Sequence, residues 1–334
     1  MKVEARYYEK FEDYLQCKLC PHLCKILPGK KGICRVRINQ DNKLWAIDYG
    51  ETTSIALDPI EKKPLYHFYP GSQILSIACN SCNMHCPFCQ NWEISQQEVH
   101  TEYLSPEMLV KIFLEHRSIG VSYTYTEPLM WFEYLLDATK LIKENGGKNV
   151  LVTNGLINEE PLKELLPFID AMNIDLKTMN PDIYKKKLGG DLNTIQKTIE
   201  ISHQHCHIEI TNLIVTGMND KIEEIEKLID YVASVDKNIP LHFSRYYPNY
   251  KYTKSPTSIN VLQDAYERAR TRLKFVYLGN VPGEDGSNTY CPKCGNLLIE
   301  RMYFRSLIKG LKNGNCAKCG EKINIILNNQ DDEK

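Results

Sequence analysis

Short apolar runs alternate with longer amphipathic stretches over the central part of the chain. The short runs are rich in β-branched and aromatic side chains and predict strands. The longer stretches carry apolar residues three and four positions apart, as in Leu135, Ala138 and Ile142, and predict helices. The predicted strands are Ile74–Ala78, Val121–Thr124, Asn149–Thr153, Ala171–Asp175, His207–Val215, Pro240–Ser244 and Lys274–Leu278. The predicted helices include Pro106–His116, Leu129–Glu144, Asn193–Ser202, Asp220–Val235 and Val261–Leu273.

Repeated strand–helix alternation implies parallel strands joined by right-handed crossovers. The units are too few for a complete eight-fold barrel, so the pattern predicts an α/β fold with an open, partial (β/α)6 TIM-like barrel. A doubly wound sheet is the alternative. We expect a cysteine-rich metal-binding segment at residues 1–70, a core domain at 71–286 and a zinc-ribbon-like module at 287–334.

Composition and charge exclude several classes of protein. The 334 residues hold 41 Lys and Arg against 42 Asp and Glu, a balance that argues against a protein that coats nucleic acid. No apolar run approaches the roughly 18 residues of a membrane helix. The first residues, Met1–Phe11, lack the apolar core of a signal peptide. We therefore expect a cytoplasmic protein with no membrane span.

The thirteen cysteines are the main chemical signal. Disulfides are rare in a reducing compartment, where grouped cysteines more often bind metals or act in catalysis. Twelve of the thirteen fall into three groups of four, between Cys17 and Cys34, between Cys79 and Cys89, and between Cys291 and Cys319.

The central group follows the first predicted barrel strand. Cys82, Cys86 and Cys89 lie within eight residues and can hold three corners of a [4Fe-4S] cluster, leaving one iron without a protein ligand. An open metal position is typical of a catalytic site. S-adenosylmethionine could chelate that iron, and one electron would then cleave its S–C5′ bond to give a 5′-deoxyadenosyl radical. Phe88 could stack on the adenine. The alternative is a closed structural cluster or zinc site completed by Cys79.

The Cys-x3-Cys-x-aromatic-Cys motif resembles the signature of the radical S-adenosylmethionine (SAM) superfamily. The longer string Cys86-Pro-Phe-Cys89-Gln-Asn-Trp-Glu93 is similar to the branch of pyruvate formate-lyase activating enzymes. Within that branch, the chain resembles the radical SAM enzymes of the AmmeMemoRadiSam system. The supporting strings are Lys63-Pro-Leu-Tyr-His-Phe68, Tyr123-Thr-Tyr-Thr-Glu-Pro128, Val152-Thr-Asn-Gly155, Ile174-Asp-Leu-Lys177 and Tyr277-Leu-Gly-Asn-Val-Pro282.

The resemblance implies cofactor-binding roles for residues at the ends of later strands. Thr126 and Glu127 follow the second strand, where the carboxylate can accept hydrogen bonds from the methionyl amino group. Glu127 and Pro128 also suit the start of a helix, and both roles can hold together. Asn154 ends the third strand.

Two further pairs follow the fourth and sixth strands. Asp175 and Lys177 match positions near the methionyl or ribose part of the cofactor, and their alternative is a partly solvated ion pair. Arg245 could clamp a carboxylate, and His242 could bond the ribose or the substrate. The alternative for His242 is a packed core or rim residue.

The two flanking cysteine sets also predict metal sites. Cys291, Cys294, Cys316 and Cys319 form paired Cys-x2-Cys knuckles, which are typical of zinc, with an auxiliary iron–sulfur cluster as the alternative. For the N-terminal set, zinc and a second iron–sulfur cluster both remain open, and His22 could replace one thiolate. The members of that set are Cys17, Cys20, Cys24 and Cys34.

Together these features predict a radical SAM oxidoreductase that abstracts hydrogen from a peptide, a protein or a small molecule. The resemblance implies Memo-like and AMMECR-like partner proteins and an electron donor such as flavodoxin or ferredoxin. One alternative is an activase of a glycyl-radical enzyme, although the chain lacks a ferredoxin-like insertion between Cys89 and Glu127. The alternative from another class is a non-enzymatic metal-binding scaffold or nucleic-acid-binding protein.

Overall fold

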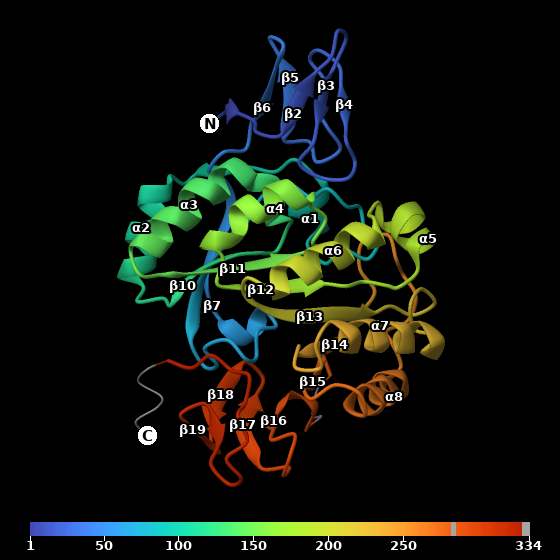
Figure 1. Ribbon diagram of the computed structural model, residues 1–334. Helices are drawn as coiled ribbons and strands as arrows, with labels where there is room; N and C mark the ends of the chain where they lie inside the picture. Colours follow the sequence, from blue (N-terminus) through green and yellow to red (C-terminus); the bar gives the residue numbers. More distant parts are fainter. Residues whose placement is uncertain (282–284, 329–334) are drawn as a thin grey trace.

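The computed structural model describes residues 1–281 and 285–328. A large central sheet with helices along it separates two smaller β-rich parts, one N-terminal and one C-terminal (Figure 1). The last residues of the predicted C-terminal module, 329–334, and Pro282 lie outside the described residues.

The central sheet has nine strands. Its parallel part contains seven strands, and each of them overlaps a predicted strand. The prediction of a six-stranded barrel therefore gave one strand too few. Two antiparallel strands extend the β8 edge. In sheet order the strands are β15 (Val276–Gly279), β14 (Leu241–Arg245), β13 (His207–Ile214), β12 (Ala171–Asp175), β11 (Lys148–Thr153), β10 (Gly120–Tyr123), β8 (Gln73–Cys79), β7 (Glu51–Pro59) and β9 (Glu102–Tyr103).

Strand order distinguishes the two predicted architectures. A doubly wound sheet reverses its order at a switch point, and its helices cover both faces. Here the parallel strands follow one another strictly along the chain, from β8 to β15. The α/β fold is therefore confirmed, and the arrangement is consistent with an open, partial barrel rather than with the doubly wound alternative.

Helices connect the parallel strands and pack their apolar faces on the sheet, as with α3, whose buried residues include Leu135, Ala138 and Ile142 (Figure 1). Local capping explains where α2 begins. Ser105 accepts a hydrogen bond from the Met108 amide at the start of α2. The helices are α1 (Trp92–Gln96), α2 (Pro106–Glu115), α3 (Phe132–Glu144), α4 (Glu159–Leu165), α5 (Pro181–Ile183), α6 (Leu192–His203), α7 (Ile222–Val235) and α8 (Ile259–Arg270), with short helical turns η1 (Ile60–Lys62), η2 (Pro128–Trp131), η3 (Leu166–Phe168), η4 (Tyr184–Leu188) and η5 (Asp285–Ser287).

The N-terminal part consists of two small antiparallel sheets, ordered β1-β6-β5 and β2-β3-β4. They pack against the central domain through a buried ion pair between Arg37 and Glu133 of α3. The predicted segment of residues 1–70 also contains β7, which belongs to the central sheet. The strands are β1 (Val3–Glu4), β2 (Tyr8–Lys10), β3 (Leu15–Cys17), β4 (Lys25–Ile26), β5 (Arg37–Gln40) and β6 (Lys43–Ala46).

The C-terminal part is a three-stranded sheet beside a two-stranded one. It docks on the segment before β8, where Arg301 donates to the Tyr66 carbonyl at 2.7 Å and the Ile326 amide donates to the His67 carbonyl at 2.8 Å. Among the described residues, no helix has the length and apolar character needed to cross a bilayer. The strands are β16 (Thr289–Tyr290), β17 (Leu297–Met302), β18 (Arg305–Ile308), β19 (Leu311–Lys312) and β20 (Asn315–Cys316).

Candidate functional site

The cysteine loop, residues 80–91, joins the carboxyl end of β8 to α1. The amide of Glu127, which follows β10, donates to the Ser81 carbonyl at 3.1 Å. At the other side of the loop, the His85 ring packs on Gly189 so closely that a Cβ on this glycine would lie 2.1 Å from the ring. Gly189 also has a φ of +70°, so both the space beside the His85 ring and the backbone conformation require glycine here. The loop is thus held at the edge where parallel strands end, which is where barrel active sites form.

Three thiols of this loop influence one another. Burial raises the pKa of Cys82 well above its usual range, and Cys86 and Cys89 raise it further. Burial also raises the pKa of Cys86 to about 11, whereas the nearby Lys177 ammonium opposes that rise. Cys82 and Cys86 therefore need a cationic partner to ionise, and iron is such a partner.

The Cys79 thiol has other neighbours. It lies at the end of β8, 1% exposed, with Sγ 3.2 Å from Thr126 Oγ1 and 3.4 Å from Ser81 Oγ. Thr126 Oγ1 in turn donates to the Cys79 carbonyl at 3.0 Å. Cys79 and Thr126 therefore form part of the wall behind the loop. A closed metal site would require Cys79 to leave these hydrogen bonds.

Glu127 connects the ends of two strands. Its Oε1 accepts from the Leu129 amide at 3.1 Å and from Thr153 Oγ1 at 2.6 Å, and its Oε2 accepts from the Asn154 amide at 2.7 Å. The expected helix-start role is confirmed, since Glu127 caps η2. Burial raises its pKa to about 7 against these hydrogen bonds. The three bonds leave acceptor capacity for one more donor.

Asn154 and Lys177 bring the next strand ends to the same loop. Asn154 Nδ2 lies 3.8 Å from Cys82 Sγ and donates to Asn83 Oδ1 at 3.0 Å. Lys177 Nζ pairs with Asp175 at 2.8 Å. Burial lowers the pKa of Lys177, but the charges of Asp175 and Cys86 outweigh burial and raise it. This ion pair is partly solvated, with side-chain exposures of 16% for Lys177 and 33% for Asp175, as the alternative from the sequence expects, and the charge of the Cys86 thiol acts on Lys177.

The remaining predicted cofactor residues have protein partners. The Phe88 ring packs edge-on against Tyr246, with centroids 6.5 Å apart. Arg245, at the end of β14, donates through Nε to the Thr257 carbonyl at 2.8 Å. His242 lies within β14, where its Nε2 is 2.6 Å from Glu209 Oε2, so its position matches the alternative of a packed core residue. A contact with the cofactor would require His242 to leave this buried carboxylate.

Two buried polar residues near the site were not identified from the sequence pattern. Asn83 is fully buried and donates through Nδ2 to the Leu156 carbonyl at 2.8 Å. Lys63 is 1% exposed and pairs with Asp58 at 2.7 Å, beside Tyr125, whose carbonyl accepts from the cysteine loop. Burial lowers the pKa of Lys63 to about 8. In the sequence Lys63 stands between Lys62 and Pro64, a context that gives no sign of burial.

The C-terminal cysteines form the most compact group of metal ligands. Cys291 and Cys319 have Sγ atoms 3.6 Å apart, and those of Cys294 and Cys316 are 3.7 Å apart. All four lie within 4.8 Å of one another. A zinc ion with Zn–S bonds of about 2.3 Å would separate its thiolates by about 3.8 Å, so the four thiols fit a tetrahedral zinc site.

The sequence comparisons agree with this geometry. The sequence model of the radical SAM superfamily matches residues 76–232, which include the cysteine loop and Glu127, Asn154 and Lys177. An uncharacterized protein of Methanocaldococcus jannaschii is 45% identical, covering 97% of this chain and 99% of that protein. The chain belongs to the radical SAM superfamily. Radical SAM proteins bind a [4Fe-4S] cluster and SAM, and the cysteine loop has the three thiols that such a cluster needs.

More distant matches lie within the same superfamily. The pyruvate formate-lyase 1-activating enzyme of Escherichia coli is 25% identical, over 50% of this chain and 70% of that enzyme. A crystal structure of SuiB from Streptococcus suis, bound to the precursor peptide SuiA, superposes with a TM-score of 0.50 and 16% identity, covering 64% of this chain and 48% of SuiB. That likeness concerns the radical SAM fold alone.

Proposed function

We propose that the protein is a radical SAM enzyme of the AmmeMemoRadiSam type that abstracts hydrogen from a peptide, a protein or a small molecule. The observation that carries the proposal is the convergence of one loop with the ends of three strands. Cys82, Cys86 and Cys89 would hold the cluster, and Glu127 and Lys177 would face the cofactor. When bound, the cluster and SAM supply a one-electron cleavage that yields a carbon-centred radical.

The residues around the loop suit the charged methionyl end of SAM. The free acceptor position on Glu127 suits an ammonium group, and the Asp175–Lys177 pair offers one partner for an ammonium and one for a carboxylate. Asn154 would orient the Cys82 thiolate by its amide. The same proposal gives Phe88, Thr126, His242 and Arg245 supporting roles in the adenosine pocket.

Partners and location follow from the same resemblance. We infer joint action with Memo-like and AMMECR-like proteins, and reduction by flavodoxin or ferredoxin. All thirteen cysteines are unpaired, which favours a reducing cytoplasm. A glycyl-radical activase is the second candidate, favoured by the similarity to the Escherichia coli activating enzyme.

The decisive experiment measures 5′-deoxyadenosine from anaerobically reconstituted protein with SAM and a low-potential reductant. We expect product that depends on reductant, and a fall to background in Cys86→Ala, because one corner of the cluster loses its ligand. Cys79→Ser is the matched control, since a hydroxyl can keep the bonds to Thr126 and Ser81.

Two results would contradict the proposal. One is the absence of 5′-deoxyadenosine from protein that carries a complete four-iron site, which would favour the scaffold alternative. The other is a loss of product in Cys79→Ser equal to that in Cys86→Ala, which would make Cys79 a cluster ligand.

A further inference from the structure

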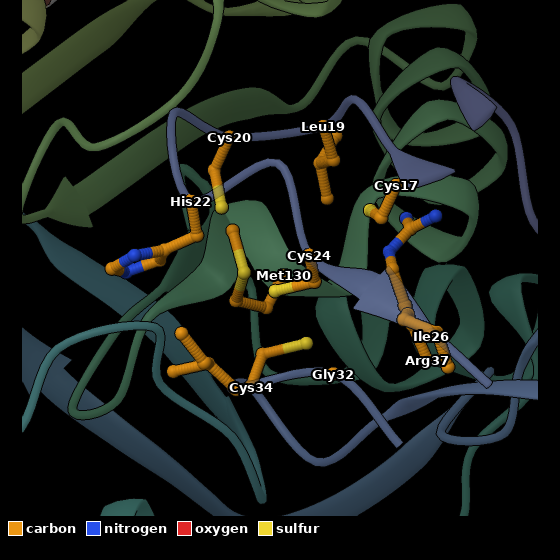
Figure 2. Close-up of a pocket in the computed structure, with 11 residues that line it drawn as sticks. Cys17, Leu19, Cys20, His22, Cys24, Ile26, Gly32, Cys34, Arg37 and Met130 are labelled. Atoms are coloured by element: carbon orange, nitrogen blue, oxygen red, sulfur yellow. The ribbon is translucent and has the colours of Figure 1, made fainter. Parts of the chain in front are cut away.

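The N-terminal part holds a second set of four thiols around one small pocket. Cys17, Cys20, Cys24 and Cys34 line it together with apolar side chains, and three of the four cysteines are buried. Figure 2 shows the four side chains pointing toward the same space from different stretches of the N-terminal chain. The apolar lining consists of Leu19, Ile26, Ile33 and Met130.

The spread of these thiols differs from that of the C-terminal set. Over the described residues, only the C-terminal cysteines bring three or more donor atoms within 4.8 Å of one another. The N-terminal thiols are therefore farther apart than a single zinc ion holds its ligands. A four-iron cluster is larger than one ion and carries its thiolates outside the cube, so it suits the wider set.

His22 is not available as a replacement ligand in this arrangement. Its Nε2 lies 2.7 Å from the Asn83 carbonyl oxygen, in the cysteine loop of the radical SAM site. The ring extends away from the four thiols (Figure 2). The ligand set that remains is four cysteines, which is the usual complement of a [4Fe-4S] cluster.

Arg37 supplies an independent sign that an anion belongs in this space. Its side chain lines the space and is 1% exposed, its Nη2 pairs with Glu133, and its Nη1 donates to the Arg6 carbonyl at 3.1 Å. Its Nε is buried and has no hydrogen-bond partner among the described residues. A buried N–H without an acceptor is costly, and cluster sulfur atoms accept such bonds.

From these observations we propose that Cys17, Cys20, Cys24 and Cys34 bind an auxiliary [4Fe-4S] cluster beside the radical SAM cluster. The proposal extends the proposed function, because it adds a second redox centre to the same enzyme. The two sites are linked by Asn83, whose side chain interacts with the Cys20 thiol and accepts from Asn154.

The linkage gives the auxiliary cluster a route for electrons. Asn83 is the neighbour of Cys82 in the chain, and Asn154 contacts both Asn83 and the Cys82 sulfur. A reduced auxiliary cluster would pass one electron to the radical SAM cluster and become oxidised by one electron. A reduced flavodoxin or ferredoxin would then restore it, again by one electron.

The test counts iron and records electron paramagnetic resonance (EPR) spectra of full-length protein reconstituted anaerobically with iron and sulfide. We expect about eight irons in the wild type, and about four in the variant Cys82→Ala/Cys86→Ala/Cys89→Ala. The reduced triple variant should show a four-iron signal that does not change when SAM is added. Cys291→Ser/Cys294→Ser is the matched control and should keep about eight irons.

The reciprocal variant separates this proposal from the proposed function. Cys20→Ala/Cys34→Ala should keep about four irons with a signal that SAM does change. In the reduced wild type, the two neighbouring spins should broaden the signals relative to both variants. Zinc without iron in the triple variant would overturn the auxiliary cluster. This result would count whatever the outcome of the 5′-deoxyadenosine assay. It would also count if Cys20→Ala/Cys34→Ala does not fold. Loss of four irons from the Cys291→Ser/Cys294→Ser control would instead place the cluster in the C-terminal module.

Discussion

At the scale of single residues, Asp48 carries a buried carboxyl between the N-terminal sheets and the central domain. The side chain is 5% exposed, and neither carboxyl oxygen has a hydrogen-bond partner in the part of the chain that the structure describes. Burial raises its pKa to about 8, against the attraction of Arg37. The folded protein therefore holds this carboxyl in its neutral form near pH 7.

This shift predicts how stability changes with pH. The pKa of Asp48 in the folded protein lies above its value in the unfolded chain. Its contribution to the free energy of unfolding is therefore complete below about pH 4 and is lost as pH rises toward 8. Because one proton is involved, the free energy of unfolding changes by at most about 1.4 kcal/mol per pH unit. Asp48→Asn should remove that slope and be the more stable protein at pH 8.

Urea unfolding at pH 5 and pH 8 measures the effect. Asp230→Asn is the matched control, because Asp230 is 65% exposed and its substitution should leave the slope unchanged. Equal pH dependence of the wild type and Asp48→Asn would mean that Asp48 is ionised in the folded protein.

At the scale of elements, one ion pair joins β5 to α3. Arg37 and Glu133 are 1% and 7% exposed and meet at 2.8 Å, and Glu133 also accepts from the Arg6 amide. Removing one member of a buried pair leaves an uncompensated charge. Glu133→Gln should therefore lower the free energy of unfolding by about 3–5 kcal/mol.

A second substitution separates charge from packing. Arg37→Met/Glu133→Gln removes both charges and should recover part of the lost stability, which urea unfolding would report. The exposed pair of Lys163 and Glu159 is the control, and Glu159→Gln should cost less than about 1 kcal/mol. Similar losses for Glu133→Gln and Glu159→Gln would contradict a dominant role for burial.

Elements also differ in how well the sequence predicts them. The strand β8 is buried on both faces after its first residue, as parallel strands are, and its continuous apolar run identifies it. The strands of the N-terminal part have two to four residues, as in β1 (Val3–Glu4), and are too short to show a period. Their pairing depends on contacts with distant partners, such as β1 with β6, which local pattern does not contain.

At the scale of the whole molecule, the C-terminal module closes one end of the central domain. Arg301 lies 4.2 Å from the centre of the Tyr66 ring, and Ile326 forms a bridge with Phe68. The module has a small core of its own, to which Tyr66 and Tyr277 also contribute. If its four cysteines bind zinc, as their geometry predicts, its folding should depend on that metal.

Removing that metal tests this dependence. In Cys294→Ser/Cys316→Ser we expect loss of one zinc per chain and faster hydrogen exchange at the Ile326 amide, which bonds to His67. The amide of Val150 in β11 serves as the internal control and should keep its protection. Unchanged exchange at Ile326 in zinc-free protein would show that packing alone holds the module.

Sequence spacing was sufficient wherever a site lies within a short stretch of chain. Cys82, Cys86 and Cys89 are bound to be neighbours because a few residues join them, and the same holds within each Cys-x2-Cys knuckle. The alternation of strands and helices likewise predicted the α/β fold, because the spacing of apolar residues along each element shows which of its faces is buried. These features depend on chain connectivity and on the local pattern of apolar residues, both of which the sequence contains.

Contacts between distant segments required the folded chain. His22 meets Asn83 across 61 residues, and His242 meets Glu209 rather than a strand-end ligand because strand register places them together in the interior. Register and curvature arise from the packing of the whole sheet, so no local pattern encodes them. The sequence thus names three candidate sets of metal ligands, while only the fold shows that His22 joins the N-terminal set to the cysteine loop and that the Cys79 thiol lies against Thr126 and Ser81.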